Sequence, residues 1–157
     1  MVRITGTIFL VLFLFLFLSD CDKPTKEDFI LEILREVNEV RSTGCFCGED
    51  SMPPVHALLW DDALDMAAQR HVRDMSLNNY LDHIGTDAST PYQRAAEAGF
   101  EGAFIGENIA RGYLTIQDVM NQWIHSPSHC RTIMDDHYYY IAVAYDDYYW
   151  VQMFGSN

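Results

Sequence analysis

The sequence has few basic residues. It contains 10 Lys and Arg against 23 Asp and Glu, and its formal net charge is −13. A nucleic-acid-binding surface needs clustered Lys and Arg to displace counterions from the phosphates, so this class of partner is disfavoured. The same negative charge repels anionic membrane surfaces. We therefore expect no nucleic acid among the partners, and membrane contact only through the N-terminal segment.

Long apolar runs are also missing. The longest is Ile8–Leu18, which has 11 residues and follows a single early cation, Arg3. It is too short to span a bilayer comfortably as a helix but fits the apolar core of a secretory signal. A buried core helix is the competing interpretation, and the Leu-Phe repetition without a polar face disfavours it. The sequence predicts an export signal over 1–20, a short tether over 21–27 and one domain over 28–157.

The end of the export signal has no Ala-x-Ala cleavage site. Instead, Leu18, Ser19 and one further residue precede Cys21 in an order that resembles the lipobox of bacterial lipoproteins, in which the Cys is acylated. Asp20 departs from that pattern, which has a small neutral residue there. Lipidation of Cys21 is the favoured interpretation, with ordinary cleavage or retention as a membrane anchor as alternatives. Each of them places the domain outside the cytoplasm, as a membrane-attached lipoprotein or a secreted protein.

Cysteines are scarce too, and the four present are Cys21, Cys45, Cys47 and Cys130. An exported chain lies in a compartment that permits disulfides. Cys45 and Cys47 are too close together to pair with each other without strain. We therefore expect one of them to pair with Cys130, for a stabilisation of about 2–4 kcal/mol. A zinc site is a poorer interpretation, because Cys-x-Cys with one distant Cys is not a common zinc pattern.

Apolar periodicity and capping residues predict helices before strands. Helices are expected over 25–43, 61–78, 90–98 and 115–126. Strands are expected over 104–110, 138–145 and 148–154, the last two forming a hairpin around Asp146-Asp147. Residues 44–59 are predicted to be a loop, and Pro127 to end the last helix. This order favours an α+β sandwich with an antiparallel sheet.

Three residues stand out as candidates for chemistry. His83 follows the second predicted helix, His129 follows the last one, and Glu107 lies in an otherwise apolar strand. A carboxylate there is costly unless it is paired or faces a cavity. Two imidazoles and a carboxylate are able to bind a divalent metal with one position left open. They are equally able to form a hydrogen-bonded cluster that only fixes the fold. His71 is expected to be a core histidine.

Several sequence blocks resemble one known family. In chain order they are Asn79–His83 with Gly85, Arg94-Ala95, Gly99-Phe100, Gly106–Ala110, Trp123–Cys130, Ile133-Met134 and Trp150–Gly155. Together these blocks resemble the CAP superfamily of cysteine-rich secretory proteins, antigen 5 and pathogenesis-related 1 proteins, whose domain is also called SCP. The bacterial single-domain branch is the most similar. The resemblance covers about residues 28–155.

The resemblance implies a three-layer α-β-α sandwich with a central antiparallel sheet and a shallow cleft. In the family, two His and two Glu line this cleft. His83 and His129 match the histidines, and Glu107 matches the first glutamate. The position of the second glutamate falls in a segment without an acid, where Ser126 or His125 stands instead. This departure puts in doubt any mechanism that needs both carboxylates.

The resemblance also implies a disulfide pairing. Relatives with a Cys after the second His often carry a Cys-Gly pair in the early loop, which corresponds to Cys47-Gly48 in this sequence. The implied disulfide is therefore Cys47–Cys130. Cys45 is then left over if Cys21 carries lipid.

The function favoured by the resemblance is that of a binding or interaction module. Its His83, Glu107 and His129 cleft would hold a divalent metal, zinc first, and its ligand would be an unidentified lipid, peptide or protein of the envelope or the extracellular space. The chain is expected to be a monomer. The alternative is a metal-dependent, peptidase-like hydrolase with Glu107 as general base. Ser126 as a nucleophile with His129 as its base lacks an evident third group and an oxyanion hole.

Overall fold

The computed structural model describes residues 25–156, so the predicted export signal and the lipidation of Cys21 lie outside the described residues. Its helices are α1 (Lys26–Thr43), α2 (Asp62–Asn78), α3 (Pro91–Glu97), α4 (Ile116–His125) and α5 (Pro127–Met134). Its strands are β1 (Cys45–Cys47), β2 (Asp50–Met52), β3 (Leu59–Trp60), β4 (Phe104–Arg111), β5 (Tyr140–Asp146) and β6 (Tyr149–Ser156). Within this range, no helix is long and apolar enough to cross a membrane.

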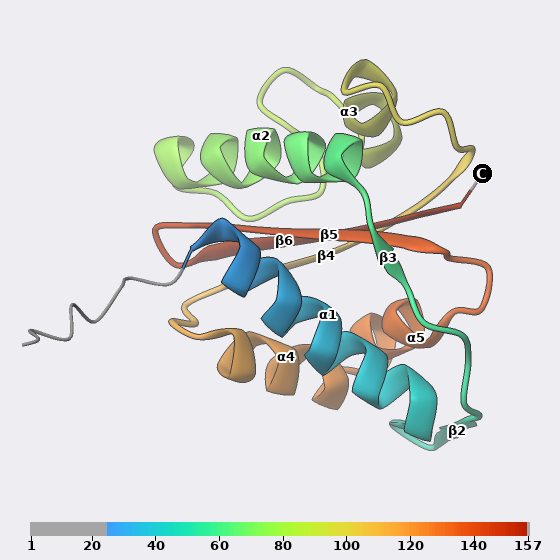
Figure 1. Cartoon of the computed structure of the whole chain (residues 1–157). Helices are drawn as coiled ribbons and strands as arrows, with labels where there is room; N and C mark the ends of the chain where they lie inside the picture. The colour runs from blue at the N-terminus through green and yellow to red at the C-terminus, as the bar shows by residue number, and fades with distance from the viewer. Residues whose placement is uncertain (1–24, 157) are drawn as a thin grey trace, which may run out of the picture.

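A four-stranded sheet separates two layers of helices. Its strand order is β3-β5-β6-β4, and α2 and α3 cover one face while α1, α4 and α5 cover the other (Figure 1). The predicted α+β sandwich of three layers is therefore confirmed. The sheet is antiparallel except at one edge, where β3 runs parallel to β5. This parallel pair is short because Asp61, directly after β3, already caps α2.

The two helical layers explain why the strands are apolar on both faces. Successive side chains of a strand point to opposite faces of a sheet. In β5, Ile141 and Val143 pack in the core beneath α1, α4 and α5. Ala142 and Ala144 pack in the second core, beneath α2 and α3. With both faces buried, the strand reads as a continuous apolar run instead of alternating with polar residues.

Capping side chains fix where the helices begin. Thr25, Thr90 and Thr115 each accept a hydrogen bond from a main-chain N–H in the first turn of α1, α3 and α4. An N-cap of this kind satisfies one of the donors that a helix leaves unpaired at its start. The four predicted helices are confirmed to within a residue or two at each end.

Two predictions of local structure were wrong, and one helix was missed. The predicted loop over 44–59 contains the β1-β2 hairpin and β3. Pro127 does end α4, but it also begins α5, because proline is well tolerated in the first turn of a helix. The turn between β5 and β6 is Asp147-Tyr148, one residue later than expected, and both of its residues have positive φ.

Candidate functional site

His83 is carried by a loop that follows α2. The helix ends at Asn79, which has a left-handed conformation, and the chain then folds back along the helix. His71 of α2 donates from Nε2 to the carbonyl of Asp82, at 2.8 Å. Asp74, one turn later, accepts from the main-chain N–H of Thr86 at 2.8 Å and from its hydroxyl at 2.6 Å. These contacts fix the loop on both sides of His83.

Glu107 of β4 is the buried centre of the site. Its side chain is 2% exposed, and its two carboxylate oxygens have different partners. Oε1 lies 2.7 Å from His83 Nδ1, and Oε2 lies 2.7 Å from a terminal nitrogen of Arg94. Because a carboxylate only accepts, the Nδ1 of His83 carries the proton. The partners that the sequence required for a carboxylate in an apolar strand are therefore present.

Arg94 of α3 joins the carboxylate to the loop. Its side chain is 1% exposed, and it also donates to the carbonyls of Ser89 at 2.8 Å and His83 at 3.1 Å. A buried guanidinium needs a counter-charge and acceptors for its N–H groups. Glu107 and the two carbonyls meet this need at the terminal nitrogens, whereas the buried Nε has no hydrogen-bond partner among the described residues. The same arginine therefore holds the loop and orients the carboxylate that contacts the ring of His83.

His129 lies in the first turn of α5, where the sequence analysis placed it just past a helix. Its main-chain carbonyl accepts from Asn108 of β4 at 3.2 Å, and Asn108 also donates to Gln152 of β6 at 2.9 Å. Its Nδ1 is buried and has no hydrogen-bond partner among the described residues. The main chain of His129 is thus hydrogen-bonded to Asn108, the strand residue that follows Glu107. The Nδ1 of its ring remains free to make a further bond.

The electrostatics of the two imidazoles are opposite. The hydrogen bond to Glu107 and the charge of that carboxylate raise the pKa of His83. Burial lowers the pKa of His129, and the charge of His83 lowers it further. Protonation of His83 therefore disfavours protonation of His129. Burial also lowers the pKa of His71, consistent with a neutral ring that uses Nε2 as its donor.

The structure thus joins His83 directly to Glu107 and leaves His129 outside that contact. Residues 25–156 hold two groups of three potential ligands with all ligand atoms within 4.8 Å of one another. One group is Asp135, Asp136 and His137, the other is Cys45, Cys47 and Cys130, and neither is the predicted set. Metal binding by His83, Glu107 and His129 therefore stays a prediction.

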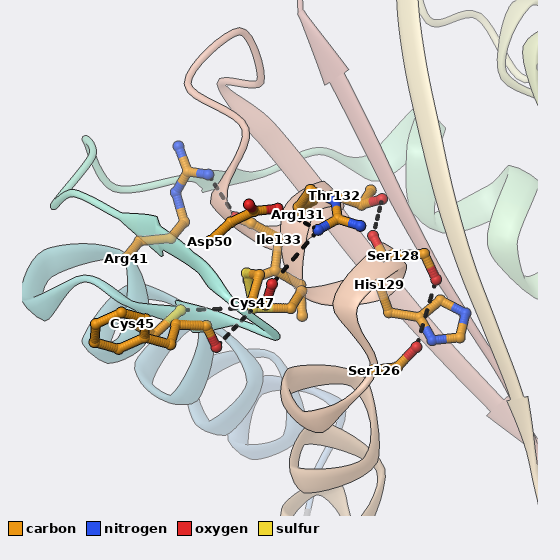
Figure 2. Close-up of a disulfide and its surroundings, with 12 residues drawn as sticks. Arg41, Cys45, Cys47, Asp50, Ser126, Ser128, His129, Arg131, Thr132 and Ile133 are labelled. Atoms are coloured by element: carbon orange, nitrogen blue, oxygen red, sulfur yellow. Dashed lines mark hydrogen bonds and ion pairs between the residues drawn. A yellow bond between two sulfur atoms is a disulfide. The ribbon is translucent and has the colours of Figure 1, made fainter.

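The two residues considered for the missing second glutamate have other contacts. Ser126 Oγ lies 3.4 Å from Ser128 Oγ, and no hydrogen bond joins it to His129 within the described range (Figure 2). His125 is exposed, and its Nδ1 lies 2.8 Å from the carbonyl of Asn121. Neither contact supplies a third group of the kind that a serine nucleophile needs.

The disulfide joins β1 to α5. Cys47 and Cys130 are bonded, both are fully buried, and Figure 2 shows the bond beside the first turns of α5. This is the pair that the family resemblance implies. It ties the β1-β2 hairpin to the helix that carries His129. Cys45 keeps a free thiol.

Sequence reasoning missed the buried cations and the acid that support these elements. Arg94 belonged to one of the recognised blocks but had no assigned role, and Asp74 had none either. Arg41 of α1 is fully buried and donates to four main-chain carbonyls, those of His56, Ile133, Asp135 and Tyr138. Burial lowers the pKa of Arg41 to about 10. A cation on the apolar face of a predicted helix was the available signal in that case.

Comparison with known proteins supports the resemblance. The sequence model described as the cysteine-rich secretory protein family, CAP, matches residues 34–154. The uncharacterized protein YkwD of Bacillus subtilis is 30% identical over 96 residues, covering 60% of this chain and 37% of YkwD. The uncharacterized membrane protein YlbC of the same organism is 29% identical over 97 residues, covering 62% of this chain and 28% of YlbC. The chain thus spans about a third of these relatives' length.

Solved structures share the fold. An extracellular protein from Bacillus anthracis that contains an SCP domain superimposes with a TM-score of 0.73 at 23% identity, over 82% of this chain and 40% of that one. An outer surface protein of Borrelia burgdorferi gives a TM-score of 0.69 at 23% identity, over 84% of this chain and 94% of its own. At such identities the likeness concerns the fold alone.

Proposed function

Because this chain belongs to the cysteine-rich secretory protein family, we propose that it acts outside the cytoplasm as a binding module whose His83 and His129 rings hold a divalent cation. Two structurally similar proteins carry the words extracellular or outer surface in their names, which supports this location. With a lipid on Cys21, the N-terminal signal would leave the domain attached to the membrane. Without that lipid, cleavage of the signal would release the domain. The ligand would be a lipid, peptide or protein of the envelope or its surroundings, and the domain would act as a monomer.

The contact between His83 and Glu107 carries this proposal. Metal-ligating histidines commonly donate their second ring N–H to a carboxylate, which fixes the tautomer and the ring orientation. His83 donates from Nδ1 to Glu107, and its side chain is 49% exposed. The lone pair of its Nε2 is therefore left to bind a metal ion. Zinc binds imidazole nitrogen readily, and the bound ion would act as a Lewis acid able to bind an anionic or carbonyl group of the protein's ligand.

The same geometry assigns Glu107 a supporting role. Both of its oxygens are already engaged, by His83 and by Arg94, and its side chain is almost fully buried. Direct coordination of the cation, or proton abstraction by Glu107, would require one of these hydrogen bonds to break. The proposal therefore uses His83 and His129 as ligands and Glu107 as the residue that orients His83, and binding is favoured over hydrolysis.

Calorimetric titration with zinc tests the proposal. We expect His83→Ala and His129→Ala to abolish the binding heat of the wild-type chain, and Glu107→Gln to weaken affinity by about 10–100-fold. His137→Ala is the matched control, because His137 lies in the separate exposed group with Asp135 and Asp136. Wild-type binding that is absent, or that is lost in His137→Ala and retained in His83→Ala, would refute the proposed site.

A peptidase assay separates the alternative function. Unstructured protein is incubated with wild type and with Glu107→Gln, with and without zinc. We expect no cleavage by either. Cleavage by wild type that Glu107→Gln removes would show that Glu107 acts as a base, contrary to the supporting role proposed for it.

A further inference from the structure

Three sulfur atoms lie together between the β1-β2 hairpin and α5. The Sγ atoms of Cys45, Cys47 and Cys130 are all within 4.8 Å of one another, and Cys45 Sγ is 3.6 Å from Cys130 Sγ (Figure 2). Cys47 and Cys130 form the disulfide, so that the free thiol of Cys45 is next to one of the bonded sulfurs. Met52, Val55 and Met134 contribute to the apolar surroundings.

Strand geometry gives Cys45 and Cys47 the same access to Cys130. Residues two apart on a strand point to the same face, and in β1 this is the face that packs against α5. Pairing of Cys130 with Cys47 spans 83 residues, and pairing with Cys45 would span 85. Because loop-closure entropy changes very little over two residues, the choice between the pairings depends on local packing alone.

We propose that Cys45, Cys47 and Cys130 form a thiol–disulfide exchange site, in which Cys45 is the nucleophile, Cys130 the central sulfur and Cys47 the leaving group. The Cys45 thiol first loses its proton to solvent. Its sulfur then bonds to Cys130 Sγ, the bond between Cys130 and Cys47 breaks, and its electron pair goes to Cys47 Sγ, which takes up a proton. The step needs no external oxidant or reductant.

Two features of the surroundings make the step feasible. Exchange requires the three sulfurs to come into line, and β1 belongs to a separate two-stranded sheet, so that it is able to shift without breaking the central sheet. Cys130 lies in the first half of α5, whose N-terminal dipole favours negative charge on nearby sulfur. Burial raises the pKa of the Cys45 thiol, so the reactive thiolate is scarce at neutral pH and the exchange is slow.

The consequence is a cross-link that persists while the free thiol changes place. Either pairing ties the hairpin to α5, so the link to the helix of His129 remains. Cys45 is half-buried and Cys47 is fully buried in the observed pairing, which favours Cys47 as the bonded partner at equilibrium. A thiol reagent that reaches the hairpin would then react with one cysteine or the other, depending on the pairing.

Disulfide mapping tests the proposal on the full oxidised chain, with Cys21→Ser in every sample so that only the three clustered cysteines remain. The protein is incubated under native conditions and then quenched in acid, which protonates the thiolates and stops exchange. Free thiols are then trapped with maleimide and the disulfide-linked peptides sequenced by mass spectrometry. We expect a minor Cys45–Cys130 population that grows to a constant level, with label on Cys47. Exclusive Cys47–Cys130 pairing with label only on Cys45 would overturn the proposal.

Three variants complete the test. Cys47→Ser should oxidise to a Cys45–Cys130 disulfide and keep most of the wild-type melting temperature, whereas Cys45→Ser/Cys47→Ser should show the full loss. Failure of Cys47→Ser to form this disulfide, with a melting temperature equal to that of the double variant, would show that Cys45 does not reach Cys130. Cys45→Ser is the matched control and should never carry label on Cys47. If Cys47→Ser does not fold, the mapping of the wild-type pairing still decides.

Discussion

Replacing Glu107 by Gln should destabilise the domain strongly, because it removes the counter-charge of a buried arginine. The side chains of Glu107 and Arg94 are 2% and 1% exposed. Breaking a buried ion pair by removing one partner typically costs about 3–5 kcal/mol. Gln keeps one oxygen as an acceptor for Arg94, which places the expected loss near the lower end, at about 3 kcal/mol. In a domain of this size the melting temperature should fall by roughly 10 °C.

Urea denaturation is the assay, with the midpoint and the slope fitted separately. An unchanged slope shows that only stability has changed. Glu97→Gln is the matched control, because Glu97 pairs with Arg70 on the surface, where the side chains are 58% and 46% exposed. Exposed pairs of this kind contribute about 0–1 kcal/mol.

A double-variant cycle with Arg94→Met isolates the pair. We expect Glu107→Gln/Arg94→Met to be less destabilised than the sum of the two single changes, because no charge is then left buried alone. A loss below about 1 kcal/mol for Glu107→Gln, together with additive effects, would refute the reasoning that Glu107 neutralises Arg94.

Three further predictions concern other parts of the structure. The raised pKa of His83 means that its contact with Glu107 contributes fully below the unfolded pKa of about 6.5 and is lost as the pH rises through the folded value. The melting-temperature difference between wild type and His83→Ala should therefore narrow from about pH 6 to about pH 9, and a constant difference would contradict this. Arg41→Met should cost about 3 kcal/mol in urea denaturation, because four carbonyls lose their donor, and a loss under about 1 kcal/mol would show that water replaces it. Gly106→Ala should lower the free energy of unfolding by about 1–3 kcal/mol, since the new Cβ would clash with the hydroxyl of Tyr138. Adding Tyr138→Phe should recover part of that loss in urea denaturation. No recovery would show that the clash lies elsewhere.

The sequence predicted the helices well because their ends carry chemical signals. Thr25 and Thr90 are placed where a side chain is able to accept from the first turn, and Pro91 fits the position after the cap. Such signals are local and act within four residues. The pairing of β3 with β5 joins Leu59 to Tyr140, and no local pattern specifies a contact of that range. Pro127 is compatible both with the end of α4 and with the start of α5, so its presence alone does not predict the second helix.

The candidate site shows the same division. A carboxylate in an apolar strand predicts that Glu107 has a partner, and the family blocks indicate His83. The second partner, Arg94, lies on another helix and was not identified, because the sequence does not show which cation reaches a buried acid. The spacing of His83 and Glu107 from His129 also depends on how α5 is placed, and this helix was not predicted.

The anchoring of the loop that carries His83 has a consequence for how freely its sequence is able to vary. The supporting side chains of α2 and α3 contact mainly main-chain atoms of the loop, namely the carbonyls of Asp82, His83 and Ser89 and the N–H of Thr86. Every residue except proline has these atoms, so these particular contacts do not depend on which side chains the loop carries. Leu81 and Ile84, which are exposed beside His83, are therefore positions where a library of substitutions would change ligand preference while the backbone stays in place.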